Sequence, residues 1–392
     1  MISLVKYKLV FASPGLGYLF AASIIGRLPI GMSGLSILLL VQGASESFAT
    51  GGAATGCFVA GLALVAPVLG RIIDRYGPWV VLITSAVLFP AWLVALVAAV
   101  SAETSLLTVA LCAAAAGACF PPITVCVRTF LRQHFGDDPL LTTAYSLDSV
   151  LIETIFIVGP MLVALFVAVA SPRFAIWFAA ACGFIGVFLF LRSGAMREWR
   201  IEARTRGTLL GPLAQRRFGA LIVIVVCYAI AFGLTELGAT AYANEAGRPA
   251  LAGVFLGLMS AGSAFGGLAY GSAHWHAPLL RQFSATLAIM GVGLLVLAAP
   301  WSQLVFSLLC IFAGVVMAPA LIIQSMIVAK TAKPEHTTEA FTWSSSALLG
   351  GVGLGMGFGG VLVETWHSPA SFAAAGAAAL LAAIGAIWLS RR

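Results

Sequence analysis

The stretch PWVVLITSAVLFPAWLVALVAAV, from Pro78 to Val100, contains no charged residue. A helix that crosses a bilayer core about 30 Å thick needs roughly 20 apolar residues, so this stretch is long enough to span a membrane. Similar stretches recur along nearly the whole chain, in which 9% of residues are charged, 61% are hydrophobic and the mean hydropathy is +1.05. Soluble domains do not have this composition. The sequence therefore predicts an all-α, polytopic membrane protein.

Twelve transmembrane helices are predicted, six in each half of the chain. In the first half their ranges are 17–42, 49–70, 78–100, 106–130, 141–170 and 173–191. In the second half their ranges are 218–242, 251–271, 283–299, 304–329, 338–363 and 370–389. We expect Pro121, Pro122 and Pro319 to bend the fourth and tenth spans at equivalent points, because proline removes a backbone hydrogen bond. The first span is too long for the apolar region of a secretory leader, so we expect it to be retained.

The positions of lysine and arginine predict the orientation of these spans. If the N-terminus lies inside the cell, all 21 Lys and Arg residues fall in inner loops or at inner helix ends except Arg27, Arg173 and Arg248. This asymmetry is what the positive-inside rule requires, and it places both termini in the cytoplasm. The net charge of +7 is therefore interpreted as a topological signal, and no nucleic-acid partner is predicted.

The two halves of the sequence repeat each other at a shift of about half the chain length. The aligned pairs are Ala144–Ser149 with Ala340–Ser345, Gly117 and Pro122 with Gly314 and Pro319, and Gly70 and Asp74 with Gly267 and Gly271. Parallel repeats of this kind are a known plan of transporters. The repeat predicts an N-terminal six-helix half over 1–191, a cytoplasmic central loop over 192–217 and a C-terminal six-helix half over 218–392.

A short motif lies between the second and third predicted spans. The stretch GRIIDRYGPW, Gly70 to Trp79, resembles the loop signature GxxxDRxGRR of the major facilitator superfamily. The matching residues are Gly70, Asp74, Arg75 and Gly77. Pro78 and Trp79 replace the two trailing basic residues. The resemblance implies twelve helices in two pseudo-symmetric halves, and a gating role in which Asp74 makes charge contacts at helix ends. From the residues alone, Asp74 could instead cap only the start of the third span.

Further motifs resemble particular branches of this superfamily. Gly159 and Pro160, in IFIVGPMLVA, keep the core of the antiporter signature GxxxGPxxGG. The stretches Arg27–Met32, RLPIGM, and Asp148–Glu153, DSVLIE, resemble bacterial sugar-efflux-like or drug-exporter-like members. The resemblance implies antiport and a location in the bacterial inner membrane.

Four ionisable side chains inside the predicted spans are candidates for function, because an unpaired charge there costs roughly 3 kcal/mol. They are Arg27, Asp148, Glu153 and Glu236. At about 1.5 Å per residue, Arg27 and Glu153 lie at similar depth near the midplane. We hypothesise that Glu153 couples protons or competes with substrate and that Arg27 is its partner. The alternative is an ion pair that only cross-links two helices.

The other two candidates lie away from the midplane. Asp148 is nearer the cytoplasm, where Arg128 could neutralise it. Glu236 lies in the outer half of its span, as either a gate or cation-recognition group or a wetted residue of the outer vestibule. Polar side chains that could line a cavity are Tyr145, Thr154, Tyr228, Gln324 and Trp343.

No cofactor or metal site is predicted. His274 and His276, in HWH, have ligand-like spacing, but no third ligand is evident. No convergent nucleophile and base indicate an enzyme. The predicted function is secondary active transport by alternating access, with proton-coupled efflux of a small organic compound. Its partners are that substrate, protons and the lipid bilayer, and the protein is expected to be a monomer. The alternatives are proton-coupled uptake and, outside this class, a non-transporting membrane sensor.

Overall fold

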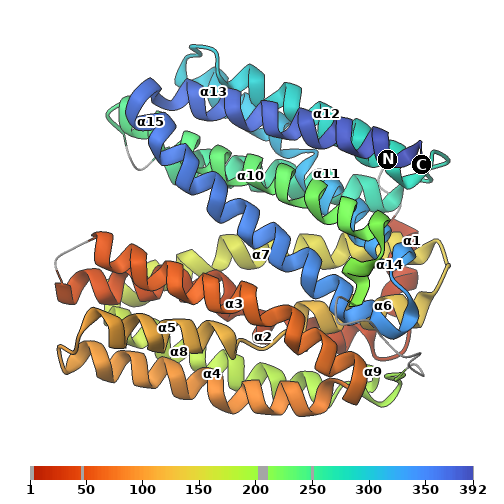
Figure 1. The fold of residues 1–392 in the computed structure, drawn as a ribbon, viewed down its shortest axis with the longest axis horizontal. Helices are drawn as coiled ribbons and strands as arrows, with labels where there is room; N and C mark the ends of the chain where they lie inside the picture. The colour runs from red at the N-terminus through yellow and green to blue at the C-terminus, as the bar shows by residue number, and fades with distance from the viewer. Residues whose placement is uncertain (1–3, 46–47, 202–210, 249–250, 392) are drawn as a thin grey trace.

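The computed structural model describes residues 4–45, 48–201, 211–248 and 251–391, and the part that it describes is built of helices. Two layers of long helices lie one above the other (Figure 1). Both chain termini lie at one end of the molecule, here called the terminal end, and the opposite end is called the distal end. The predicted all-α membrane fold is confirmed.

The first layer is formed by helices of the N-terminal half. They are α2 (Leu16–Ser45), α3 (Phe48–Tyr76), α4 (Pro78–Ser101), α5 (Leu106–Ala118), α6 (Ile123–Phe135), α7 (Leu140–Val169) and α8 (Pro172–Leu191). The second layer is formed by helices of the C-terminal half. They are α10 (Arg216–Glu245), α11 (Leu251–Ser272), α12 (Leu279–Leu297), α13 (Gln303–Gly314), α14 (Met317–Thr331) and α15 (Thr337–Ser390).

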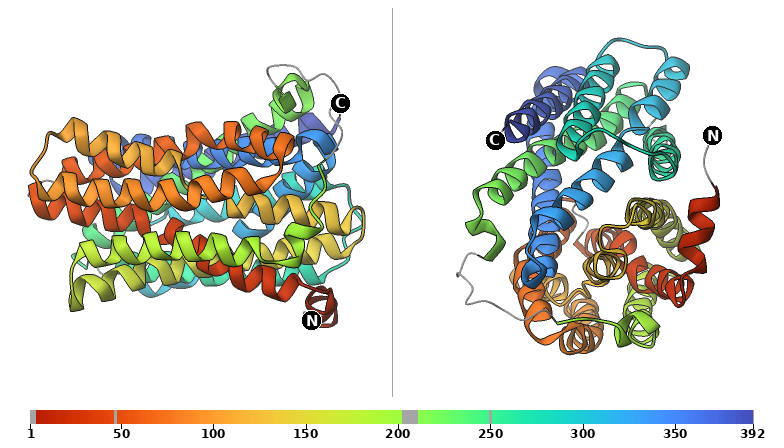
Figure 2. Two further views of the ribbon diagram at one scale, coloured as in Figure 1. Left: turned by 90° about the horizontal axis from the view of Figure 1, so that it is seen from below. Right: turned by 90° about the vertical axis from the view of Figure 1, so that its right-hand side faces the viewer.

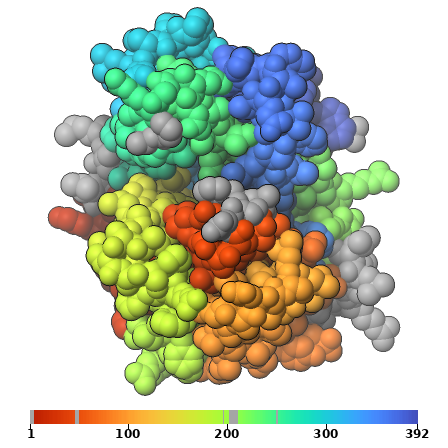
Figure 3. Space-filling view, turned by 90° about the vertical axis from the view of Figure 1, so that its left-hand side faces the viewer, coloured from red at the N-terminus to blue at the C-terminus, as the bar shows by residue number. Residues whose placement is uncertain are grey.

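Short elements lie outside these spans. They are α1 (Leu4–Ala12), α9 (Gly194–Arg197), and the 3₁₀ turns η1 (Gly211–Ala214) and η2 (Pro334–His336). Part of the expected central loop, 202–210, lies outside the described residues. Figure 3 views the distal end, where the N-terminal half lies below and the C-terminal half above.

The predicted spans agree with the helices to within a few residues. The largest difference is in the second span, which continues to Tyr76 rather than ending at residue 70. Eleven helical segments of the described chain are long and apolar enough to cross a membrane. The last of them contains two spans, because α15 is broken at Trp366 and His367, where His367 has φ 63°. Figure 1 shows α15 turning at the distal end and returning to the C-terminus.

Two spans are interrupted at matching points, as the prolines predict. The fourth span is divided into α5 and α6, and Pro122 is the N-cap of α6. The tenth span is divided into α13 and α14, and Pro319 lies in the first turn of α14. Each break gives a half-helix whose first backbone N–H groups lack partners within the helix. These N–H groups lie inside the molecule, where polar side chains can bond them.

Glycines allow close contact between neighbouring helices. A Cβ atom added to Gly26 would lie 3.3 Å from the backbone of Gly186 on α8. Gly351 and Gly355 of α15 lie in the same way against the α10 backbone, within 2.7 and 2.2 Å of an added Cβ. Apolar side chains gain little from burial against each other in lipid, so small residues that let backbones approach are a main source of helix association.

Candidate functional site

The motif around Asp74 joins the two halves at the terminal end. Asp74, in the last turn of α3, accepts hydrogen bonds from the backbone N–H groups of Thr338, at 2.9 Å, and Glu339, at 2.8 Å. These N–H groups lie in the first turn of α15, in the other half, so Asp74 caps the N-terminus of that helix. The positive end of the helix dipole favours a carboxylate at this place. A purely local role for Asp74 at the start of α4 is therefore wrong.

Arg71 and Gly70 complete this contact, which is called the α3–α15 seam. Arg71 donates to Oε1 of Glu339 through Nη2, at 2.6 Å, and Nε, at 3.1 Å. Glu339 is fully buried. A Cβ atom on Gly70 would lie 2.4 Å from Thr342 Oγ1 and 3.0 Å from Glu339 Cα. The seam thus contains an ion pair between Arg71 and the buried Glu339, and at Gly70 the two helices approach so closely that only glycine fits.

A second contact between the halves, the α7–α11 seam, contains no ion pair among the described residues. Ser146 donates to the carbonyl of Gly267, at 2.6 Å, and Thr143 donates to the carbonyl of Gly271, at 2.8 Å. Tyr7 of α1 donates to the carbonyl of Leu268 and lies 2.9 Å from the Ser146 hydroxyl. Burial raises the pKa of Tyr7, so its hydroxyl stays neutral. Helix α1 therefore contacts both helices of this seam through Tyr7.

Arg27 lies in a buried charge cluster within the N-terminal half. Its Nη1 donates to Oδ1 of Asp148, at 2.6 Å, and its side chain is 2% exposed. Arg128 donates to Oδ2 of the same carboxylate, at 3.0 Å. The contact between Arg128 and Asp148 that the sequence suggests is present. The predicted pairing of Arg27 with Glu153 is wrong, because Asp148 takes the place of Glu153.

Two N–H donor groups of the charge cluster have no acceptor among the described residues. Nε and Nη2 of Arg27 are buried without a hydrogen-bond partner among the described residues. Two arginines share one fully buried carboxylate, so the cluster as a whole carries an excess positive charge. A buried cluster of this kind depends on all of its members, because removing one leaves an uncompensated charge.

Glu153 lies midway along α7 and contacts the other half. Its Oε1 accepts a hydrogen bond from Ser263 of α11, at 2.9 Å. The same Ser263 hydroxyl accepts from the backbone N–H of Ala318, at 3.0 Å, in the first turn of α14. The break in the tenth span thus supplies a half-helix N-terminus, and Glu153 lies beside this positive end of a helix dipole.

Glu236 lies apart from the other charges. It is exposed on α10, and no hydrogen bond or ion pair to its carboxylate is found among the described residues.

The structure brings together only some of the residues predicted to line a cavity. Tyr228 donates to the side-chain oxygen of Gln324, and Gln324 donates to Ser344, at 2.5 Å. Tyr145 is buried and donates to the carbonyl of Arg128, at 3.1 Å. Thr154 is exposed and bonds its own helix at Val150. The indole N–H of Trp343 is buried without a partner among the described residues.

The remaining motif residues have structural explanations. Gly77 has φ 80°, a conformation that favours glycine, and it precedes α4 with Pro78 at the first helical position. Arg75 lies over the ring of Tyr76, at 5.0 Å. Gly159 lies against Gly31, where an added Cβ would be 2.7 Å from the backbone of α2. Gly159 therefore permits close packing inside the N-terminal half.

Sequence reasoning missed several residues of these contacts. They are Tyr7, Arg71, Ser263 and Glu339. An acidic residue in the first turn of a predicted span was a usable signal for Glu339, and the motif itself contains Arg71. No local pattern indicated Ser263, whose partners are 110 and 55 residues away in sequence.

Comparison with known proteins gave one family and several similar folds. The model of the Major Facilitator Superfamily matches residues 19–336. The crystal structure of the human organic anion transporter TETRAN is similar with a TM-score of 0.76 and 16% identity, over 94% of this chain and 98% of that one. A bacterial homologue of the iron transporter ferroportin, in an outward-facing state, gives 0.76 and 16%, over 96% and 99%.

A third similar structure is the fucose:proton symporter of Escherichia coli. Its TM-score is 0.72 and its identity 13%, over 96% of this chain and 98% of that one. A comparison with curated protein sequences gave no match. At these identities the likeness shows the fold alone.

Proposed function

This chain belongs to the major facilitator superfamily and is a membrane transporter, and from that premise we propose that it exchanges protons for a small organic compound. The exchange proceeds by alternating access in a monomer, and Glu153 carries the proton. The observation that carries the proposal is the hydrogen bond from Ser263 to Glu153, which joins an ionisable group in one half to the other half.

The terminal end corresponds to the cytoplasm in this proposal. The loops and helix ends on that side carry nearly all the lysines and arginines, as the positive-inside rule requires for the inner membrane of a bacterium. The α3–α15 and α7–α11 seams close that end. The structure then corresponds to the state that is closed toward the cytoplasm.

Glu153 links protonation to this closure. In the closed state its carboxylate accepts from Ser263 beside the N-terminus of α14, and both favour the charged form. Protonation removes that charge and weakens a contact between the halves, so it favours separation at the cytoplasmic end. Proton release to the cytoplasm restores the charge and favours closure.

The direction of substrate movement follows from this sequence of steps. Protons enter the cell because the protonated carrier opens inward, and the carrier returns outward without the proton. A compound bound from the cytoplasm during the return step is exported. The antiporter-like Gly159–Pro160 pair and the resemblance to exporter-like members support this direction over proton-coupled uptake.

The isosteric change Glu153→Gln is expected to abolish the coupling of substrate transport to the proton gradient. It should leave the exchange of substrate across the membrane intact. Substrates are first identified by screening small organic compounds against purified protein in vesicles that contain a pH-sensitive dye. If one proton is exchanged per substrate molecule, a pH difference of one unit can support a ratio of about ten between the substrate concentrations on the two sides of the membrane. We expect the variant to lower this ratio to about one. Exchange of labelled for unlabelled substrate without a gradient should continue.

Glu364→Gln is the matched control, because it makes the same change at an exposed carboxylate of the other half. It should keep the gradient-driven ratio. If Glu153→Gln still concentrates substrate in response to the pH gradient, the proton does not travel on Glu153. If substrate and protons move in the same direction, the protein is a symporter and the export proposal is wrong.

A further inference from the structure

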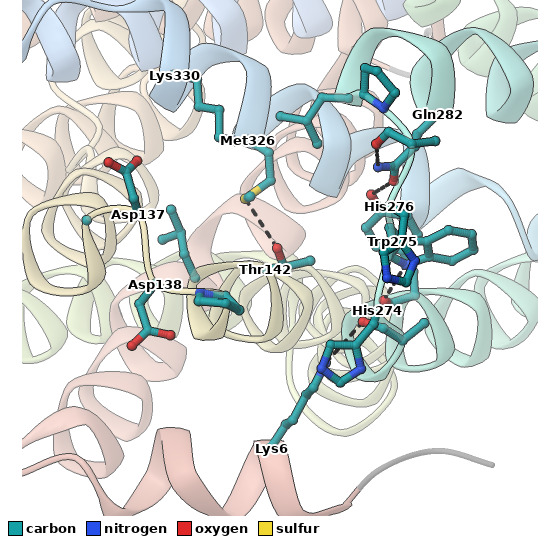
Figure 4. A pocket seen from close by; sticks show the side chains of 18 of the residues that line it. Lys6, Asp137, Asp138, Thr142, His274, Trp275, His276, Gln282, Met326 and Lys330 are labelled. Carbon is teal, nitrogen blue, oxygen red and sulfur yellow. Dashed lines mark hydrogen bonds between the residues drawn. The ribbon is translucent and has the colours of Figure 1, made fainter.

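A pocket of about 430 Å³ lies at the terminal end between the two halves. The N-terminal half contributes residues of α1, α6, α7 and the turn between α6 and α7. The C-terminal half contributes α14 and the turn from α11 to α12, which contains the HWH stretch. Figure 4 shows His274, Trp275 and His276 along one side of the pocket, with Lys6 and Lys330 at its edges. This volume is within the range of small-molecule sites.

The basic groups around the pocket have free donors. Lys6 uses one donor on the carbonyl of Ala273, at 3.0 Å, and Arg132 uses Nε on the carbonyl of Ala329, at 3.0 Å. Lys330 and both histidines are exposed, and no side-chain partner for them is found in the described part of the chain. Ammonium, guanidinium and imidazole N–H groups that line one pocket are donors for phosphate oxygens.

Two carboxylates on the pocket edge do not cancel this charge. Asp138 accepts from the backbone N–H of Leu140, at 2.8 Å, in the first turn of α7. Asp137 is 88% exposed and lies 4.0 Å from Arg132. Three lysine and arginine side chains therefore exceed two carboxylates by one positive charge, and the histidines add further N–H donors.

The wall beside the histidines is rigid. Trp275 stacks on Tyr270 with ring centroids 4.9 Å apart, and its indole N–H donates to the carbonyl of Tyr270, at 3.0 Å. Gln282 accepts from Tyr270, at 2.5 Å, and donates to the carbonyl of Ala277, at 2.6 Å. These contacts fasten the turn that presents both histidines to α11 and α12.

The pocket exists only while the terminal end is closed. Residues that line it make two contacts between the halves: Thr142 donates to the sulfur of Met326, and Arg132 donates to the carbonyl of Ala329. Separation of the halves would break these contacts and divide the basic groups between two surfaces. A ligand that needs both surfaces binds the closed state alone and stabilises it.

We infer that this pocket is a binding site for a phosphate-bearing anion, held by Lys6, Arg132, His274, His276 and Lys330, that locks the terminal end shut. The phosphate comes either from a soluble metabolite or from the headgroup of an anionic lipid, for which basic pockets between membrane helices are suited. The binding claim is independent of the transported substrate and of proton coupling.

Thermal unfolding of the purified full chain tests the site, with inorganic pyrophosphate as the soluble probe. The lipid probe is phosphatidylglycerol in nanodiscs, compared with phosphatidylcholine. We expect one of the two probes to raise the unfolding temperature. The double change Lys330→Gln and His276→Gln should weaken its binding about tenfold or more, because one charge-assisted hydrogen bond contributes about that factor.

Arg281→Gln is the matched control, because Arg281 is exposed at the same end but does not line the pocket. Asp74→Ala, which loosens the α3–α15 seam, should lower the apparent affinity about fivefold without touching the pocket. The inference is overturned if neither probe raises the unfolding temperature, or if Arg281→Gln removes the rise as fully as the double change. It is also overturned if Asp74→Ala leaves the affinity unchanged. None of these outcomes depends on Glu153.

Discussion

Asp148→Asn is expected to remove most of the folded protein. The carboxylate is fully buried and balances both Arg27 and Arg128, and asparagine would leave two guanidinium groups without a counter-charge. Breaking a buried ion pair on one side destabilises a protein by about 3–5 kcal/mol, a large part of a total stability of about 5–15 kcal/mol. Fluorescence-detected size-exclusion chromatography after detergent extraction would show the loss of the monodisperse peak.

A double change separates charge balance from volume. Arg27→Met with Asp148→Leu removes the buried pair and keeps the space filled, while Arg128, at 11% exposure, can direct its head toward solvent. We expect this double variant to recover most of the monodisperse protein. A stable, fully active Asp148→Asn variant would contradict the structural role. A stable variant without transport would show instead that the cluster moves during the cycle.

Gly70→Val is expected to slow transport about fivefold or more while the protein stays folded, a size that follows from the cost of overpacking. Valine would place carbon atoms where Thr342 and the backbone of Glu339 lie in the closed state, and overpacking of this kind costs about 1–3 kcal/mol. Since the clash exists only when the halves meet, it shifts the equilibrium toward the state that is open at the terminal end, by about 5- to 150-fold. Initial rates of substrate exchange in vesicles measure the loss.

Gly56→Val is the control for this prediction. Gly56 lies on the same helix, and no atom lies within 4 Å of an added Cβ there. This variant should transport at the normal rate. Equal rates for the two variants would mean that the close approach at Gly70 is not needed in the cycle.

The fold could be predicted from the sequence because the thickness of the bilayer sets the length of each apolar run. The span from Pro78 to Ser101 is almost identical to the predicted 78–100, since its ends are a glycine–proline pair and the end of the apolar run. Helix α1 could not be separated in this way. Leu4–Ala12 is short and contains Lys6 and Lys8, so it has no apolar run long enough to mark a span.

The charged pairs could be predicted only in part, because depth does not specify direction around a helix. Arg27 and Glu153 lie at similar depth, but Asp148 and Glu153 are five residues apart and therefore about 140° apart around α7. Asp148 faces the interior of its own half, whereas Glu153 faces α11. Which of the two meets Arg27 depends on how α7 is rotated, and hydropathy does not contain that information. The partner of Arg71 is equally hidden, since Glu339 is 268 residues away.

The two seams at the terminal end occupy repeat-related places but differ in chemistry. Asp74 of α3 corresponds to Gly271 of α11. In one seam the Asp74 carboxylate accepts from the N–H of Thr338, and in the other the Gly271 carbonyl accepts from the hydroxyl of Thr143. Arg71 is 37% exposed, so salt acts on the first seam at this exposed partner, while Glu339 is buried and the second seam has no ion pair among the described residues. Ionic strength and membrane surface charge therefore act on the contact between the halves mainly at one seam.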